Sequence, residues 1–166
     1  MSETAYLAGG CYWGMEELFR TLPGVIETEV GFSGGHIANV AYREVTTGTT
    51  GHAETLKIVF DATVISYRDL LFEFFRIHNP TKLNQQGNDI GTQYRSAIFY
   101  MSEDQKETAL VVIAQVEKSG LWLSPIVTEV TPFTSFHPAE EKHQKYLMKV
   151  PDGYTCHFRR DFDFGE

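Results

Sequence analysis

The chain has 166 residues, a length typical of one domain with a hydrophobic core of its own. Hydrophobic residues make up 42% and charged residues 22%, a composition typical of a globular protein rather than a disordered one. The formal net charge of -8 argues against a nucleic-acid partner, because binding a phosphate backbone requires clustered Lys and Arg.

Hydrophobic periodicity predicts alternating strands and helices along the chain. In chain order we expect a strand at Tyr6–Ala8, a helix at Trp13–Leu22, strands at Val25–Phe32 and Thr55–Asp61, a helix at 67–78, a strand at Arg95–Met101, a helix at 103–119, a strand at Ile126–Thr131 and a helix at Pro138–Met148. Ser66 and Ser102 are expected N-caps, and Gly120 is expected to end the helix before it. Within the second strand, Ile26, Val30 and Phe32 should share the buried face.

This order predicts an α/β (α+β) fold, a two-layer sandwich whose sheet is mixed and mainly antiparallel, with a ferredoxin-like core. Two long polar connections, Ser33–Gly51 with a helical turn at Tyr42–Val45 and Thr81–Tyr94, are expected to carry the site. No repeat or linker divides the chain, so we expect one domain over 1–166, with 150–166 as a mobile C-terminal tail.

The candidate nucleophile is Cys11, which follows Gly9-Gly10 where the first strand turns into the first helix. Unpaired N–H groups and the helix dipole at that position favour a thiolate, and the glycines allow a tight turn. The alternative is a cysteine that is only a small buried core residue.

The cysteine content and the termini bear on the compartment. Residues 1–4 lack the positive and apolar regions of a signal peptide, and no apolar run is long enough to span a membrane. We therefore expect a cytoplasmic protein with no membrane contact. In that reducing compartment Cys11 and Cys156 would form at most a transient, catalytic disulfide.

The segment Gly10-Cys11-Tyr12-Trp13-Gly14 resembles the active-site signature of the A-class peptide methionine sulfoxide reductases. Four further segments match that family in the same order: 42–45, 48–54, 86–96 and 138–144. The resemblance implies a two-layer α/β architecture and an oxidoreductase that repairs oxidative damage by reducing methionine S-sulfoxide, free or in proteins.

The resemblance also implies a catalytic cycle. Cys11 takes the oxygen and becomes a sulfenic acid, which condenses with Cys156. The disulfide is then opened by thioredoxin as external reductant, and no cofactor or metal takes part. We expect the enzyme to be a monomer.

Other residues receive roles around the substrate. An oxide is a poor leaving group without an acid beside it, and Glu54 in an aromatic pocket could hold a proton near neutral pH. In the family, matching tyrosines donate hydrogen bonds to the oxygen and a further carboxylate orders groups around the substrate; the corresponding residues here are Tyr42, Tyr94 and Asp89. The aromatic faces of Tyr12 and Trp13 could form a slot for the methyl group of the substrate.

Three positions depart from the family pattern. Tyr12 replaces the usual Phe, Asn79 replaces the usual Asp before Pro80, and Thr46 occupies a position where some members have a resolving cysteine. With no third cysteine, the expected relay runs in one step from Cys11 to Cys156.

Competing interpretations remain at this stage. A thiol hydrolase or transferase would need a histidine beside Cys11, and the candidates are His52, His137, His143 and His157. A non-catalytic α/β binding domain is the alternative from another class. A zinc site and a nucleotide site are disfavoured because the chain has neither C-x-x-C nor a glycine-rich phosphate motif.

Overall fold

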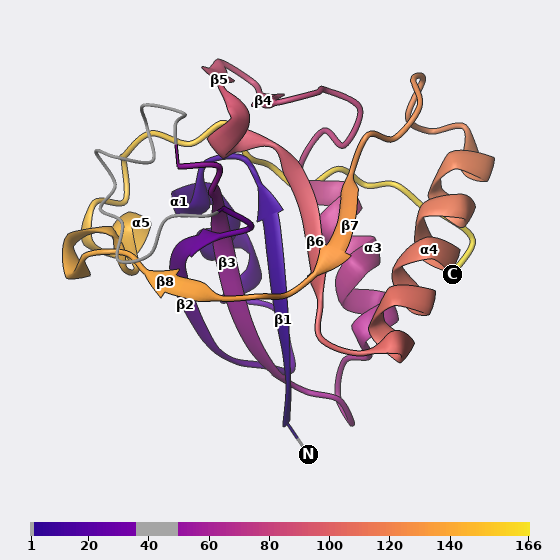
Figure 1. Cartoon of the computed structure of the whole chain (residues 1–166), viewed down its shortest axis with the longest axis horizontal. Coiled ribbons are helices and arrows are strands. Elements are labelled where there is room, and N and C mark those ends of the chain that lie inside the picture. The colour runs from indigo at the N-terminus through magenta and orange to yellow at the C-terminus, as the bar shows by residue number, and fades with distance from the viewer. Residues whose placement is uncertain (1, 36–49) are drawn as a thin grey trace.

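The computed structural model describes residues 2–35 and 50–166 of the chain (Figure 1). The elements in chain order are β1 (Ser2–Gly9), α1 (Tyr12–Phe19), β2 (Val25–Ser33), β3 (Ala53–Asp61), α3 (Tyr67–Ile77), β4 (Gln85–Gln86), β5 (Asp89–Ile90), the 3-10 helix η1 (Thr92–Tyr94), β6 (Ser96–Tyr100), α4 (Glu103–Ser119), β7 (Glu129–Pro132), β8 (Phe136–Pro138), the 3-10 helix η2 (Glu141–His143) and α5 (Tyr146–Lys149).

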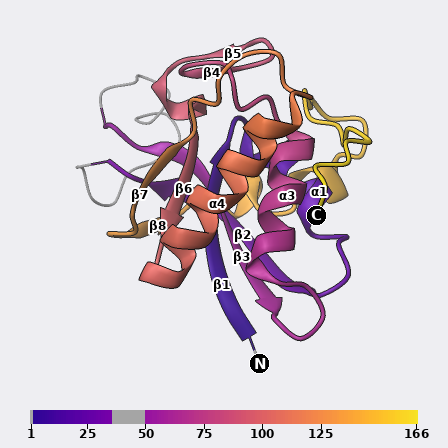
Figure 2. The ribbon, with the colours of Figure 1, turned by 90° about the vertical axis from the view of Figure 1, so that its right-hand side faces the viewer.

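The main sheet has the strand order β7-β6-β1-β3-β2-β8 among the described strands. All its neighbouring pairs are antiparallel except β6 and β7, which are parallel. Its four central strands with α1 and α3 form a ferredoxin-like core, and Figure 2 shows α1, α3 and α4 on one face of the sheet. The predicted two-layer α/β fold with a mixed, mainly antiparallel sheet is therefore confirmed.

The core lies between the sheet and α3. Leu56, Ile58 and Phe60 alternate along β3 and are fully buried, as their spacing predicts. Phe74 and Phe75 on α3 are also fully buried, and burying one such side chain contributes about 1.5–3 kcal/mol. These contacts pack the helical layer against the sheet.

The predicted helix caps are present. The Ser66 hydroxyl accepts a hydrogen bond from the backbone N–H of Asp69, and the Ser102 hydroxyl accepts one from Gln105. Gly120 ends α4 in the left-handed conformation, with φ of 69°. Each cap satisfies backbone groups that the helix itself leaves unpaired.

Three predicted details are wrong because of local backbone geometry. Ile26 is 62% exposed, since a β-bulge between Val25 and Glu27 breaks the alternation of β2. Helix α1 ends at Phe19 and not at Leu22, whose N–H instead bonds Phe19 in a tight turn toward β2. Strand β7 begins only at Glu129, because the preceding N–H groups bond partners outside the sheet: Ile126 to Glu117 and Val127 to Pro80.

The helix predicted at Pro138–Met148 is also wrong. The segment contains β8, η2 and α5, and Lys145 interrupts it with a left-handed φ of 52°. Both the backbone N–H and the ammonium group of Lys145 bond the buried carboxylate of Glu16, at 2.7 and 2.9 Å. This contact with α1 lies between η2 and α5 and keeps them as two separate short helices.

The polar connection Thr81–Tyr94 has more structure than the sequence predicts. Its β4 and β5 pair as a small hairpin, and η1 follows directly. Figure 1 shows this hairpin at the end of the sheet where β1 leads into α1. The expected helical turn at Tyr42–Val45 lies outside the described residues, as does Thr46.

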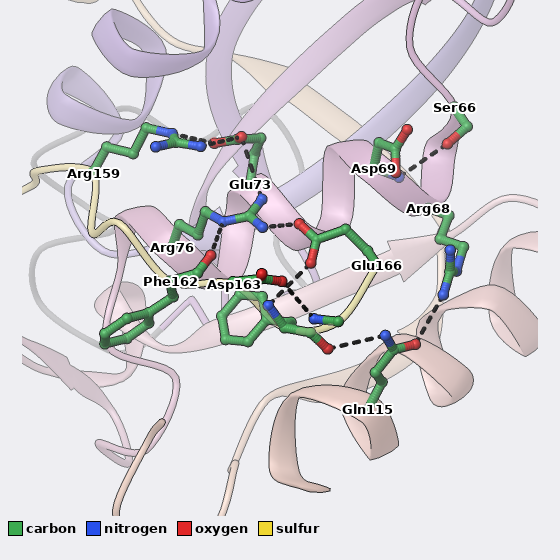
Figure 3. Close-up of polar contacts among 12 residues, drawn as sticks. Ser66, Arg68, Asp69, Glu73, Arg76, Gln115, Arg159, Phe162, Asp163 and Glu166 are labelled. Carbon is green, nitrogen blue, oxygen red and sulfur yellow. Dashed lines mark hydrogen bonds and ion pairs between the residues drawn. The ribbon is translucent and has the colours of Figure 1, made fainter. Parts of the chain in front are cut away.

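The C-terminal segment is packed against the helices, in contrast to the mobile tail that we expected. Arg159 forms an ion pair with Glu73 of α3 at 2.8 Å, and Arg76 pairs with Glu166 (Figure 3). Phe164 is 3% exposed and packs against Phe72. The segment after Cys156 is therefore fastened along the outer surface of α3. Within the described residues, no helix is both long and apolar enough to cross a membrane.

Candidate active site

Cys11 lies at the junction between β1 and α1. The turn before it uses Gly10 with φ of 95°, a conformation that favours glycine. Cys11 is the N-cap residue of α1 and only 5% exposed. The sulfur is therefore enclosed and not displayed on the surface.

The glycines around Cys11 leave room for two other segments. A Cβ atom on Gly10 would lie 2.6 Å from the side chain of Gln86, and one on Gly14 would lie 2.4 Å from Nδ1 of His157. Nε2 of His157 also bonds the carbonyl oxygen of Gly9 at 2.6 Å. The glycine-rich signature thus serves as a docking surface for the β4 hairpin and the C-terminal segment, in addition to forming a turn.

Glu54 on β3 is a buried carboxyl that is hydrogen-bonded to the residue after Cys11. It is 1% exposed, and its Oε1 accepts a hydrogen bond from the backbone N–H of Tyr12 at 3.2 Å. Its Oε2 has no hydrogen-bond partner among the described residues. Burial raises the pKa of Glu54 to about 8, the Tyr12 N–H opposes this, and the charge of Asp89 adds to it. Glu54 therefore holds a proton at neutral pH, as the acid role requires.

The expectation of a thiolate at Cys11 is wrong for the unliganded protein. Burial raises the pKa of the Cys11 thiol, the negative charges of Glu54 and Asp89 raise it further, and the N–H of Trp13 lowers it only in part. The helix N-terminus is thus outweighed by desolvation, which disfavours any buried charge. Cys11 is a thiol until something changes its surroundings.

The second cysteine, Cys156, lies beside Asp89. Its Sγ is 3.7 Å from Oδ2 of Asp89, and the Tyr154 hydroxyl donates to the same oxygen at 3.1 Å. The pKa of Cys11 also responds to Cys156, so the two sulfurs lie within electrostatic range of each other. The structure therefore brings together Cys11, Glu54, Asp89 and Cys156.

The aromatic residues after Cys11 lie in different surroundings. Tyr12 is 1% exposed and packs in the core against Phe32. Trp13 is half-buried, stacks on Tyr146 with ring centroids 3.8 Å apart, and donates from Nε1 to His143 at 3.2 Å. Of the two, the ring of Trp13 is the one accessible from solvent.

The model of the protein family described as "Peptide methionine sulfoxide reductase" matches residues 3–164 of the chain. The chain belongs to the peptide methionine sulfoxide reductase family. Peptide methionine sulfoxide reductase MsrA 1 of Mesorhizobium japonicum is 57% identical over 159 residues, which are 96% of this chain and 90% of that protein.

Solved structures agree with this assignment. Reduced Mxr1 from Saccharomyces cerevisiae aligns with a TM-score of 0.90 and 36% identity, over 96% of this chain and 93% of that one. Mxr1 in complex with Trx2 aligns with a TM-score of 0.65 and 23% identity, over 96% and 91%, and at that identity shows the fold alone.

Not every residue that the reductase family suggested can be placed around Cys11. Tyr94 is half-buried at the end of η1, which packs against β3, the strand that carries Glu54. Tyr42 lies outside the described residues. Asn79 caps the turn after α3, because its Oδ1 accepts from the N–H and hydroxyl of Thr81, so no charge is needed there.

Several residues that support the reductase site have no signal of their own in the sequence. Gln144 bonds both the N–H and the carbonyl of Val30, and Gln86 does the same for Asn79. Gln86, His143 and Gln144 lie in segments that match the family, but the match does not give their contacts. Glu16, Lys145 and Tyr146 could not have been found from spacing, since their partners are more than a hundred residues apart in sequence or on another element.

The contacts of the histidine that packs beside Cys11 do not favour a thiol hydrolase. His157 lies against Gly10 and Gly14, but its Nε2 bonds the carbonyl oxygen of Gly9 and its Nδ1 faces Cys156. No group of three potential metal ligands is present in the described part of the chain.

Proposed function

We propose that this reductase converts methionine S-sulfoxide, free or within proteins, to methionine, with Cys11 as nucleophile, Glu54 as acid and Cys156 as resolving thiol. The observation that carries the proposal is the enclosure of a protonated Glu54 carboxyl next to Cys11, with the residues on either side of Cys156, Thr155 and His157, packed on Gly14 beside Cys11. Family membership supports the substrate class.

In the first step the Glu54 carboxyl donates its proton to the sulfoxide oxygen as Cys11 attacks, and the proton released by the Cys11 thiol restores the acid form of Glu54. The Cys11 thiol and the sulfoxide become a sulfenic acid and a thioether, so the oxygen moves from one sulfur to the other. An acid whose pKa is near the working pH is suited to this transfer, because it is still protonated yet gives up the proton readily. A neutral Glu54 also removes one of the charges that oppose ionisation of Cys11.

In the second step Cys156 attacks the oxidised sulfur of Cys11, a disulfide forms and water leaves. We propose that a thioredoxin-class dithiol protein then reduces this disulfide by exchange, so that the enzyme needs no bound cofactor. The solved complex of the related Mxr1 with Trx2 supports that class of partner.

Remaining roles are part of the same proposal. Trp13 receives the methyl group of the substrate on its accessible ring, next to the buried Tyr12, while Tyr94 and Tyr42 bond the oxygen. We further propose a single domain over 1–166 that works as a monomer in the cytoplasm, where a reducing environment suits a transient disulfide.

The test uses single-turnover assays with chirally pure methionine sulfoxide. We expect Cys11→Ser to give no methionine, and Cys156→Ser to give one equivalent per protein without thioredoxin-driven turnover. Wild type should accept the S epimer and not the R epimer. Methionine formation by Cys11→Ser, or repeated thioredoxin-fed turnover by Cys156→Ser, would contradict the relay.

A further inference from the structure

The sulfur of Cys156 is surrounded by hydrogen-bond acceptors. Oδ2 of Asp89 and the carbonyl oxygen of Gln86 both lie 3.7 Å from it, and Nδ1 of His157 lies at 3.9 Å. The Tyr154 hydroxyl bonds Asp89 and also interacts with the Cys156 sulfur. Acceptors favour the S–H form of a thiol, so Cys156 is held in the form that is the weaker nucleophile.

The charges around Cys156 lead to the same result. Burial raises the pKa of the Cys156 thiol, the hydrogen bond from Tyr154 lowers it in part, and the negative charge of Asp89 together with the hydrogen bond to Asp89 raises it again, so the pKa remains raised. The Arg160 guanidinium interacts with Cys156, but its attraction does not reverse the shift. A thiol in this state needs a base to take its proton as it attacks.

The three acceptors differ in their capacity to act as that base. An amide carbonyl such as that of Gln86 is not basic at neutral pH. Nε2 of His157 must donate to the carbonyl of Gly9, which leaves Nδ1 free to accept, but burial lowers the pKa of His157 to about 4 and the ring is the most distant of the three. Burial raises the pKa of Asp89 above that of an ordinary carboxyl, which makes it a stronger base.

We propose that Asp89 is the base of the second chemical step: its carboxylate takes the proton of Cys156 as that sulfur attacks the oxidised sulfur of Cys11. The sulfur–sulfur bond forms, the sulfur–oxygen bond of the sulfenic acid breaks, and the hydroxyl leaves as water with a proton from Glu54. No further oxidant is needed, because the sulfenic acid already contains the oxidising equivalent of the sulfoxide. The inference rests on the proposed function and gives Asp89 a role toward the resolving thiol.

The electrostatic coupling between Asp89 and Glu54 supports the assignment of Asp89 as base and Glu54 as acid. The charge of Asp89 raises the pKa of Glu54, so the protein favours one ionised and one protonated group over two charges. Disulfide formation needs that pair, a base at the thiol and an acid at the leaving hydroxyl. The titratable and charged groups facing this pair are Cys11, Tyr154, Cys156, His157 and Arg160.

The experiment separates the two steps by rapid quench. Reduced protein is mixed with one equivalent of a chirally pure sulfoxide, and each sample is analysed for methionine and, by mass spectrometry, for the Cys11–Cys156 disulfide, between pH 4 and 8. We expect Asp89→Asn to slow disulfide formation about 100-fold and to abolish its decline at low pH. Tyr154→Phe keeps the carboxylate but removes a hydrogen bond that lowers the Asp89 pKa, so the decline should move to higher pH.

A second arm keeps the test decisive if Asp89→Asn also slows the first step. One equivalent of hydrogen peroxide then generates the sulfenic acid directly, and disulfide formation is followed from there. Disulfide formation at the wild-type rate in Asp89→Asn, or an unchanged decline at low pH, overturns the role of Asp89. Absence of methionine from the wild-type protein would instead overturn the proposed function, while the peroxide arm would still decide the role of Asp89.

Discussion

Two glutamates, Glu16 on α1 and Glu54 on β3, lie close to Cys11 along the chain or across the sheet, and both are 1% exposed. Glu16 accepts hydrogen bonds from the Thr28 hydroxyl and from the backbone and side-chain nitrogens of Lys145, at 2.7 to 2.9 Å. Glu54 accepts a single hydrogen bond, from the Tyr12 N–H, within the described residues. Equal burial therefore accompanies different surroundings.

The comparison shows that partners, and not depth, decide what a buried carboxyl does. Lys145 compensates the charge of Glu16, so that residue fastens α1 to the 138–149 segment that packs on Trp13. Among the described residues no such cation acts on Glu54, and Glu54 keeps a proton instead. Glu16 therefore holds the site together, and Glu54 is available for proton transfer.

The largest effect is expected for Glu54→Gln, which preserves the shape of the side chain but cannot donate an acidic proton. Loss of a general acid slows its step typically 10²- to 10⁴-fold, so we expect methionine formation to fall by at least about 100-fold. Single-turnover kinetics on the S sulfoxide measure this directly. A change below about 10-fold would show that another group protonates the oxygen.

The same substitution at the other position, Glu16→Gln, should affect stability and not chemistry. Breaking a buried pair typically costs about 3–5 kcal/mol, and because the Lys145 side chain is 37% exposed we expect about 2–3 kcal/mol less unfolding free energy. Denaturant titration provides the measurement. Methionine formation per folded molecule should stay within a few-fold of wild type, and a loss comparable to that of Glu54→Gln would remove the distinction between the two residues.

The sequence was sufficient for the parts of this molecule that depend on local pattern. The Ser66 and Ser102 caps, the alternation in β3 and the order of the main strands and helices from β1 to β7 all rest on spacings of a few residues, and the structure has them. The position of Cys11 at a strand-to-helix turn is also local.

What could not be predicted depends on contacts between distant segments. The left-handed Lys145 divides a segment with helical periodicity because Glu16, 129 residues earlier, binds it. The Cys11 pKa is likewise set by Glu54, Asp89 and burial, which no helix-terminus argument includes. The contrast between Glu16 and Glu54 is therefore a tertiary property, because the two residue types are identical.

A pH titration of stability sharpens the contrast. The pKa of Glu54 rises from an ordinary 4.5 to about 8 on folding, so the folded state binds more protons, and stability present below pH 4.5 is lost as the pH rises toward 8. Buried His78 and His157 have lowered pKa values and act oppositely, mainly below about pH 7, where unfolded histidine titrates. Because the end of this titration offsets part of the Glu54 effect, we expect the unfolding free energy of the wild type to fall by about 1 kcal/mol between pH 6.5 and 8. The decline should disappear in Glu54→Gln and persist in Glu16→Gln, as chemical denaturation at each pH would measure.

The smallest effect is expected for Arg159→Ala. This variant tests whether an exposed ion pair contributes as much unfolding free energy as the buried Glu16–Lys145 pair. Arg159 binds Glu73 at 2.8 Å, but its side chain is 47% exposed, so water and salt screen the pair (Figure 3). Exposed pairs contribute about 0.2–1 kcal/mol, and we expect a loss of that size that shrinks further in 1 M salt. Arg76 still bonds Glu166 and the carbonyl of Phe162, so the C-terminal segment should stay attached and disulfide formation should be unchanged. A loss above about 2 kcal/mol, or a slower disulfide step, would mean that the Arg159–Glu73 pair positions Cys156, and that a half-exposed ion pair here acts like the buried one at Glu16.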